Sequence, residues 1–380
     1  MKSSSRHFPQ HVAIIGLGVI GGSLGLAIKR YRPEIHVAGF DSPKVMARAR
    51  KRRAIDSAAG TLKHAVASAD IVFLCTPISS ILSLLPRVAK FVQPHTVVTD
   101  AGSVKGVVQL RAKKIFGAKG IFIGGHPMAG SEGSGIDYAD ALLFQNAVYV
   151  LCPNLPLSPP WRGIKGEDHS AMNVLAALVQ SIGARVLVMS AGEHDRVAAT
   201  ISHLPQLLAV ALTNLAGRKS KSHPAFLQLA AGGFRDMTRI ASSPFPMWND
   251  ILRCNRSQIA LVLNEMTAQL RAINRDLVRQ KSGPMQRRFR SAKLLRDAIP
   301  KNSKGFLHPL HDIYVWVDDM PGALAKITTA LFRAGINIHD IELLKIREGE
   351  AGTFRFSFDS ADDAQKAKSA LVKNLRLKVQ

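Results

Sequence analysis

The sequence predicts an α/β domain with a parallel sheet, followed by an all-helical domain and a small βαββαβ domain. Short apolar runs alternate with helical stretches in the first half, which is the pattern of a doubly wound sheet. The middle shows helical periodicity alone, and the last part has strand-like runs around two helices. With 380 residues the chain is long enough for several domains. The predicted divisions are residues 9–190, residues 191–282, a basic linker at 283–308, and residues 309–380.

The α/β part opens with the strand His11–Ile15, which Gly16-Leu17-Gly18-Val19-Ile20-Gly21 and a helix follow. This is G-x-G-x-x-G in its strand–turn–helix context, where glycines let a pyrophosphate approach and the helix N-terminus attracts it. The second strand, His36–Phe40, ends at Asp41. A carboxylate there accepts hydrogen bonds from ribose hydroxyls and repels a 2′-phosphate. These features together predict a Rossmann-type domain that binds NAD rather than NADP.

A cluster of basic residues follows this acid and has two interpretations. Lys44, Arg48 and Arg50–Arg53 either attract the 2′-phosphate of NADP or form the solvated face of a helix. The helical pattern of the segment favours the second interpretation, so NAD remains the predicted cofactor.

Three later apolar runs predict further strands, Asp70–Cys75, Thr96–Asp100 and Gly120–Ile123. Ligands of a doubly wound sheet bind beyond the carboxyl ends of its parallel strands. The early strands are therefore expected to hold the adenosine, and the later ones the nicotinamide and the substrate. The predicted cofactor contacts are Gly16, Gly18, Val19, Ile20, Gly21, Asp41, Thr76, Pro77 and Ser103.

The segment Gly124–Glu132 combines four residues of minimal side chain with one histidine and one glutamate. Glycine lets the backbone approach a ligand, and an imidazole exchanges a proton near neutral pH. His126, in a loop after a buried strand, is therefore a candidate base. The alternative is a tight turn whose histidine only caps the backbone. Ser103 is expected on a neighbouring loop, where it contacts the ligand or caps the helix that begins near Lys105.

The rest of the first domain contains a strand at Ala147–Leu151, a helix at Ala171–Ile182 and a strand at Ala184–Met189. The Pro-rich segment from Cys152 to His169 between them predicts a surface loop.

The middle of the chain is predicted to be helical and to pair two subunits. Gly192–Ala216 predicts a helix that Pro205 kinks, with His203 beside the kink. Charges interrupt the apolar pattern at Gly232–Ala241, and Ser282-Gly283-Pro284 predicts a frayed helix end and a basic linker. A helix between them has apolar residues at spacings of four and three, an a/d seam formed by Ile259, Leu263, Met266, Leu270, Ile273 and Leu277. Such a seam favours a homodimer, and packing within one chain is the alternative.

The last seventy or so residues predict a ferredoxin-like βαββαβ domain. The predicted strands are Asp312–Val317, one that opens at Gly335–Ile341, Gly352–Phe358 and Leu375–Val379. The predicted helices are Ala323–Ala334 and Ser360–Lys373. No catalytic constellation occurs in this part.

The composition excludes several classes of protein. The chain has 51 Lys+Arg against 27 Asp+Glu, a net charge of +24 that attracts anions, but no zinc-finger or RNP-type signature accompanies it. Three distant cysteines without C-x-x-C or H-E-x-x-H argue against disulfides and a metal site. The uncharged run Val12–Ile28 is too short and too rich in glycine for a membrane span. We expect a cytoplasmic protein without a membrane or specific nucleic-acid partner.

Several motifs in the same order resemble the prephenate/arogenate dehydrogenases of tyrosine biosynthesis. They are GLGVIGGSLG, HPMAGSEGSG, ISHLPQ, GFRDMTRIA and MW, and the likeness covers about residues 10–280. The C-terminal DDMPGALAKITTALFRAGINIHDIEL is similar to an ACT domain, a regulatory module that commonly binds amino acids between paired copies. The resemblance implies oxidative decarboxylation of prephenate to 4-hydroxyphenylpyruvate with NAD as cofactor. Arogenate is the alternative substrate.

The resemblance also implies roles for individual residues. His126 matches the histidine that hydrogen-bonds or deprotonates the ring hydroxyl, and Ser103 matches a serine that holds hydroxyl and nicotinamide. Arg239 matches the arginine that binds the ring carboxylate, with a structural ion pair as its alternative. His203 matches a substrate-binding histidine, with a buried core histidine as its alternative.

Three further residues are assigned by the resemblance to the substrate site. Glu132 and Arg235 are expected in a charged gate. Trp248 either comes from the partner subunit or belongs to the core. Tyrosine feedback through the ACT module is a further hypothesis, based on Gly322 and Asn337 in its ligand-type loops.

Two functions of other classes remain open from the sequence. One is a sensor that combines a Rossmann and an ACT domain without turnover, against which the intact His126, Ser103 and Arg239 argue. The other is sequence-indifferent nucleic-acid association through the basic surface, which predicts a steep dependence on salt.

Overall fold

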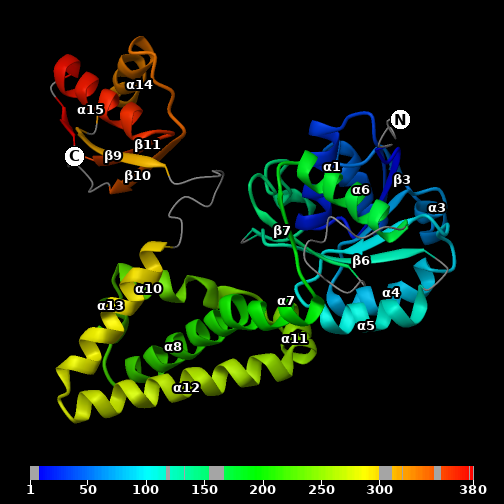
Figure 1. Cartoon of the computed structure of the whole chain (residues 1–380), viewed down its shortest axis with the longest axis horizontal. Coiled ribbons are helices and arrows are strands. Elements are labelled where there is room, and N and C mark those ends of the chain that lie inside the picture. Colours follow the sequence, from blue (N-terminus) through cyan, green and yellow to red (C-terminus); the bar gives the residue numbers. More distant parts are fainter. Residues whose placement is uncertain are drawn as a thin grey trace. The chain divides into compact units, whose positions relative to one another are not determined.

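The computed structural model describes residues 8–116, 120–131, 133–153, 167–298, 310–318, 320–345, 352–375 and 377–379. The chain forms two compact units, Met1–Arg287 and Arg288–Gln380, which we describe separately (Figure 1). Among the described residues, no helix is long and apolar enough to cross a membrane.

The first unit is organised around an eight-stranded sheet in the order β3-β2-β1-β4-β5-β6-β7-β8. Neighbouring strands are parallel, except that β6 and β7 are antiparallel. The predicted strands are confirmed, and the short β3 is an addition that the sequence pattern did not indicate. The strands are β1 (His11–Ile15), β2 (His36–Phe40), β3 (Ser57–Ala58), β4 (Ile71–Leu74), β5 (Val97–Asp100), β6 (Ile121–Pro127), β7 (Val148–Cys152) and β8 (Arg185–Val188).

Helices cover both faces of this sheet and bury an apolar core on each side. Side chains of α1, α2 and α6 pack with one face, and those of α3, α4 and α5 with the other (Figure 1). This is why the central strands are apolar throughout instead of alternating. The helices are α1 (Val19–Tyr31), α2 (Pro43–Lys51), α3 (Leu62–Val66), α4 (Ile78–Val88), α5 (Gly106–Ile115) and α6 (Glu167–Ser181). Most of the Pro-rich segment predicted as a surface loop lies outside the described residues.

Strand β6 continues to Pro127, so the expectation that His126 lies in a loop was wrong. Its pairing with β7 places His126 opposite Val150. A Cβ atom on Gly125 would lie 2.5 Å from the carbonyl oxygen of Asp100. Glycine is needed at position 125 because the backbones of β5 and β6 approach each other closely there. The loop expectation failed because β6 is extended by its pairing with β7, a partner distant in the chain that the sequence around His126 does not show.

Helices make up the rest of the first unit, and a turn divides the one predicted at Gly192–Ala216. The break is a π-helical turn at Ala199–His203. Pro205 follows closely after this turn, and the helical backbone continues through both, so the helix is distorted next to the proline. The helices are α7 (Ala191–Ala198), α8 (Leu204–Ser220), α9 (Ala225–Gln228), α10 (Gly232–Thr238), α11 (Phe245–Cys254), α12 (Arg256–Val278) and α13 (Ser282–Ala298).

The segment expected as a frayed helix end and linker begins instead with α13. Pro284 falls in its first turn, where proline is tolerated, so the breaker residues open a helix rather than end one. The division between the compact units falls within α13, between Arg287 and Arg288.

The apolar seam of α12 is mostly exposed in the single chain. Ile259 is buried, whereas Leu263, Leu270 and Leu277 are 39%, 53% and 58% exposed. A regular apolar stripe that does not pack within its own chain is typical of a surface that pairs with another subunit.

The second unit has the predicted βαββαβ layout, with a four-stranded sheet in the order β10-β11-β9-β12 (Figure 1). Two helices pack on this sheet and enclose a separate apolar core. The second strand begins at Asp340, later than the predicted Gly335. The elements are β9 (His311–Val317), α14 (Ala323–Arg333), β10 (Asp340–Lys345), β11 (Gly352–Phe358), α15 (Ala361–Leu375) and β12 (Lys378–Val379).

Candidate active site

The glycine turn between β1 and α1 is tight on its inner side and open on the other. Gly16 has φ +91°, and a Cβ on it would lie 2.7 Å from the Thr76 side chain. A Cβ on Gly21 would lie 1.9 Å from the carbonyl oxygen of Gly16. A Cβ on Gly18 would meet no atom within 4 Å. The first two glycines therefore shape the turn, and Gly18 leaves its backbone open to a ligand at the start of α1.

Asp41 and its basic neighbours have defined roles at the end of β2. The Asp41 carboxylate accepts hydrogen bonds from the backbone N–H groups of Leu17 (2.8 Å) and Ser42 (2.6 Å), which fixes it beside the glycine turn. Arg48 pairs with Asp137 at 2.8 Å. Arg52 donates to backbone carbonyl oxygens at residues 136 and 139. These two arginines of the basic cluster thus hold a neighbouring segment instead of a 2′-phosphate.

Thr76 and Pro77 lie after β4, as predicted, and lead into α4. The Thr76 hydroxyl is buried, and no partner for it occurs among the described residues. An unsatisfied buried hydroxyl on a residue that borders Gly16 of the glycine turn fits a polar cofactor group. The turn, Asp41 and Thr76 together fit NAD.

His126 belongs to a hydrogen-bonded chain that joins the sheet to the helical part. Its Nδ1 lies 2.8 Å from Nε2 of His194, and Nδ1 of His194 lies 2.8 Å from Oδ1 of Asp195. The Asp195 carboxylate also accepts hydrogen bonds from the backbone N–H groups of Lys105 (2.7 Å) and Gly106 (2.8 Å). The Nε2 atom of His126 has no hydrogen bond to another described residue, so it is available to a ligand.

Burial lowers the pKa of His126 well below its usual value, and the nearby His194, Lys105 and His203 lower it further. Lys105 is itself fully buried, where its ammonium pairs with Asp100 and donates to the carbonyl oxygen of Gly125 at 2.6 Å. His126 is therefore neutral at physiological pH, which a proton acceptor requires.

His203 is buried at the end of the π-helical turn, where Asn255 fixes its tautomer. The Nδ2 atom of Asn255 donates to the carbonyl oxygen of Asp195 at 2.8 Å, which identifies it as the NH₂ group. The same NH₂ lies 3.3 Å from Nδ1 of His203, which must then be the acceptor. Burial lowers the pKa of His203 to about 4. The ring is therefore neutral and carries its proton on Nε2, as a donor.

Trp248 on α11 packs edge-to-face against His203, with 6.0 Å between ring centroids. It also joins the apolar core of the same chain. Its indole Nε1 is buried, with no hydrogen-bond partner among the described residues. The residue thus lies beside His203 of its own chain, where its N–H is available to a polar ligand group.

The other predicted site residues differ in how the structure places them. Ser103 lies between β5 and α5 and does not cap that helix, whose N-cap is Lys105. Arg235 and Arg239 are exposed on α10 and on the 3₁₀ turn Arg239–Ser242 that follows it. Both elements pack against α8, which begins directly after His203. Glu132 lies outside the described residues.

Three consecutive parts of the chain match known families. The nucleotide-binding domain of prephenate dehydrogenase matches residues 24–188, its dimerization domain matches residues 190–291, and the ACT domain matches residues 311–374. The chain is 35% identical to the prephenate dehydrogenase of Bacillus subtilis over 362 residues, 95% of each chain. It is also 35% identical to that of Lactococcus lactis, over 95% of this chain and 97% of the relative. The chain belongs to the prephenate dehydrogenase family.

Solved structures support the fold of this family member. A prephenate dehydrogenase from A. aeolicus, crystallised with hydroxyphenyl propionate and NAD+, has a TM-score of 0.68 and 27% identity, over 76% of this chain and 98% of that one. An arogenate dehydrogenase from Synechocystis has a TM-score of 0.65 and 28% identity, over 76% and 99%. The predicted Rossmann, helical and ACT parts are confirmed.

Four residues of the site were not predicted from the sequence of this dehydrogenase. They are His194 and Asp195 on α7, Lys105 before α5, and Asn255 between α11 and α12. The adjacent His194 and Asp195 could have been noticed in the sequence, because they stand in a helix that begins just after a strand end. Their burial is what marks them as a site feature, since histidine and aspartate are seldom buried together without a partner. Nothing local marks Asn255, whose two partners are 60 and 52 residues away along the chain.

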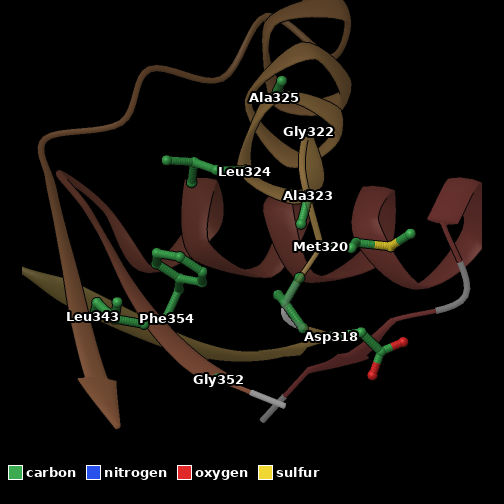
Figure 2. Close-up of a pocket in the computed structure, with 10 residues that line it drawn as sticks. Asp318, Met320, Gly322, Ala323, Leu324, Ala325, Leu343, Gly352 and Phe354 are labelled. Carbon is green, nitrogen blue, oxygen red and sulfur yellow. The ribbon is translucent and has the colours of Figure 1, made fainter. Parts of the chain in front are cut away.

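The ACT domain of this family member has an apolar pocket of about 330 Å³ between the start of α14 and the sheet (Figure 2). Met320, Leu324, Leu343 and Phe354 line it, together with Gly322 at φ +83°. Gly322 thus lies where the sequence predicted a ligand-type loop. Asn337 is not among the described lining residues, and its side chain lies 3.4 Å from that of His339.

Groups of three or more His, Cys, Asp or Glu side chains that could hold a metal are absent from the described part of the chain.

Proposed function

We propose that this protein is an NAD-dependent prephenate dehydrogenase that converts prephenate to 4-hydroxyphenylpyruvate. One observation carries the proposal. His126 is a half-buried neutral imidazole at the carboxyl edge of the sheet, with Nδ1 held by His194 and no described residue bonded to Nε2. Such a group suits the removal of a proton from a substrate hydroxyl at neutral pH. The same edge of the sheet carries the glycine turn, Asp41 and Thr76, which fit NAD.

NAD⁺, when bound, would supply the hydride acceptor for the ring carbon that bears the hydroxyl, and the ring would become aromatic with loss of CO₂. His126 takes the hydroxyl proton at Nε2 as this carbon is oxidised, and it returns a proton to the phenolate oxygen that aromatisation produces. Ser103, on the loop before α5, orients the hydroxyl. His203 donates from Nε2 to an oxygen of the substrate. Each residue is neutral, so none requires a change of charge before the reaction begins.

The two carboxylates of prephenate require cations, and we assign the ring carboxylate to Arg239 and the gate to Arg235 and Glu132. A guanidinium forms two parallel hydrogen bonds with a carboxylate, which suits this task. Both arginines are exposed in the single chain. The matched dimerization domain contains both arginines and the exposed apolar seam of α12, so we propose that the active form is a homodimer paired through this seam.

The enzyme assay that tests this function measures NADH formation with prephenate and with arogenate, each with NAD and NADP. We expect kcat/KM with prephenate and NAD to exceed the other combinations. A higher kcat/KM with arogenate than with prephenate would identify the protein as an arogenate dehydrogenase. This alternative is specific because the chain is similar to an arogenate dehydrogenase of known structure. Ligand binding without hydride transfer to NAD would contradict an enzymatic function and support a sensor.

We also propose that the ACT domain binds tyrosine and inhibits the dehydrogenase. The pocket beside Gly322 combines an apolar lining with free backbone groups at the start of α14, which suits an aromatic amino acid. Isothermal titration of the full chain with tyrosine and with phenylalanine tests this. Heat from neither amino acid would contradict the proposal.

We retain residues 9–190, 191–282 and 309–380 as proposed domains and the cytoplasm as the proposed location. Expression of residues 309–380 alone tests the last boundary, because a folded domain gives a cooperative thermal transition.

A further inference from the structure

His126, His194 and Asp195 form a chain of hydrogen bonds inside the protein. The two links measure 2.8 Å each. His194 and Asp195 are 2% and 6% exposed, so water does not compete for these bonds. Both residues come from α7, whereas His126 comes from β6. His126, which belongs to the sheet, is thus oriented by α7, the first helix of the helical part.

The donors and acceptors in this chain have only one consistent arrangement when His194 is neutral. Both oxygens of Asp195 accept backbone N–H groups, from Lys105 and from Gly106, so Asp195 acts as the acceptor toward His194 as well. Nδ1 of His194 must then carry a proton and donate to Asp195, which leaves Nε2 of His194 as a lone pair. Nδ1 of His126 must donate to that lone pair. The remaining nitrogen of His126, Nε2, is left without a proton.

We propose that His194 and Asp195 are positioning residues that hold His126 in the tautomer whose Nε2 accepts the substrate proton. This inference rests on the proposed function, because it concerns the base of that reaction. The opposite tautomer would present an N–H to the hydroxyl, and an N–H cannot remove a proton. When His126 becomes an imidazolium, its Nδ1–H still points to His194, and the carboxylate of Asp195 faces the positive charge through that ring.

The other charged and titratable groups around His126 do not supply this constraint. Lys105 approaches from the start of α5, and its ammonium is bonded to Asp100 and Gly125. His203 approaches from the π-helical turn, and its Nδ1 is bonded to Asn255. Only His194 contacts a ring nitrogen of His126 among the described residues.

Two substitutions at His194 separate positioning from packing. The amide oxygen of His194→Gln can occupy the place of Nε2 and accept from His126, whereas His194→Leu has similar volume but no acceptor. We expect His194→Leu to lower kcat about 100-fold, with KM for NAD and prephenate within about twofold of wild type. His194→Gln should retain kcat within about tenfold. Equal losses in both variants, at matched melting temperatures, would overturn the proposal.

Nitrogen-15 NMR of histidine-labelled wild-type protein provides a test that needs neither substrate nor variant. We expect a protonated Nδ1 and an unprotonated Nε2 on both His126 and His194, assigned with the His126→Asn and His194→Gln spectra. A proton on Nε2 of His126, or an imidazolium at His194, would overturn the proposal. Absence of turnover by the wild type on prephenate and arogenate would instead reject the proposed function, and the NMR result would still decide the tautomer.

Discussion

The carboxylate of Asp195 accepts a hydrogen bond from the backbone N–H of Lys105 at 2.7 Å. Asp195 belongs to α7 and Lys105 precedes α5, so this bond joins the helical part to the nucleotide-binding sheet beside His126, the proposed base. A second bond, from the N–H of Gly106, strengthens the same contact, and the helix N-terminus favours a negative charge there. The arrangement of the site therefore depends on how these two parts of the chain pack.

Replacing Asp195 should destabilise the protein as well as slow it. In Asp195→Asn, the amide cannot accept from Lys105, Gly106 and His194 at once, so at least one buried donor is left unpaired. We expect a loss of about 1–3 kcal/mol in the free energy of unfolding, measured with urea. Asp137→Asn is the control, because its pair with Arg48 is exposed and contributes about 0–1 kcal/mol. Equal losses of unfolding free energy in both variants would show that the bonds from Asp195 to Lys105 and Gly106 do not stabilise the fold.

Replacement of His126, the proposed base, should slow turnover strongly while the cofactor still binds. In His126→Asn the amide can keep the bond to His194, but Nε2 is lost. We expect kcat to fall about 10²–10⁴-fold and the Kd for NADH, measured by fluorescence, to change less than about threefold. His11→Asn, an exposed histidine at the opposite end of the sheet, serves as the control. Wild-type turnover in His126→Asn would reject this residue as the base.

Substitution of Gly21 should lower stability, whereas substitution of Gly18 should weaken cofactor binding. Gly21→Ala places a methyl group 1.9 Å from the backbone oxygen of Gly16, and we expect a loss of about 1–3 kcal/mol in stability. Gly18→Ala meets no protein atom, so its melting temperature should be that of the wild type. We expect the methyl group to raise the KM for NAD by about tenfold or more, because it occupies the open face. An unchanged KM in Gly18→Ala would mean that the cofactor does not contact this face.

Acid should destabilise the protein partly through His203. Its pKa is about 4 in the folded protein, whereas an unfolded histidine titrates near 6.5. The unfolded chain thus binds a proton that the folded protein excludes. The corresponding stability is complete above about pH 6.5 and is lost as the pH falls towards 4, at most about 3 kcal/mol.

His203→Asn removes this titration and keeps an acceptor or donor near Asn255. Urea unfolding between pH 7 and pH 4 should show a steeper loss of stability for the wild type than for the variant. Parallel curves would contradict the lowered pKa of His203.

The ACT pocket should respond to a substitution that fills it. Leu324 lines the pocket near the start of α14, and Leu324→Arg places a long cation inside. We expect the tyrosine concentration for half-inhibition to rise about tenfold or more. Val372→Lys adds a charge on the exposed face of α15, which is not part of the described lining, and should leave inhibition unchanged. Equal inhibition of both variants would place the tyrosine site elsewhere.

Much of the fold follows from local patterns in the chain. The sequence pattern predicted β1, β2 and β11 with their observed bounds. For β1 the signal is an apolar run, because a strand whose sheet is covered on both faces is apolar almost throughout. The helix around residues 256–278 followed from its a/d spacing. Helix α13 was missed because Ser282-Gly283-Pro284 can either end a helix or begin one, and the local sequence does not distinguish the two.

The sequence by itself determined the strands of the sheet, the glycine turn and Asp41, and it proposed His126 as the proton acceptor, because each depends on residues that are close together in the chain. Only the tertiary structure decided what controls that acceptor. His194 and Asp195 are 68 and 69 residues from His126, and no short-range pattern reports that His194 bonds to His126 and Asp195 to His194. The structure also replaced the expected loop at His126 by a strand, since pairing with β7 is a long-range property. Tautomers follow from hydrogen-bond directions in space, which the order of residues alone does not contain.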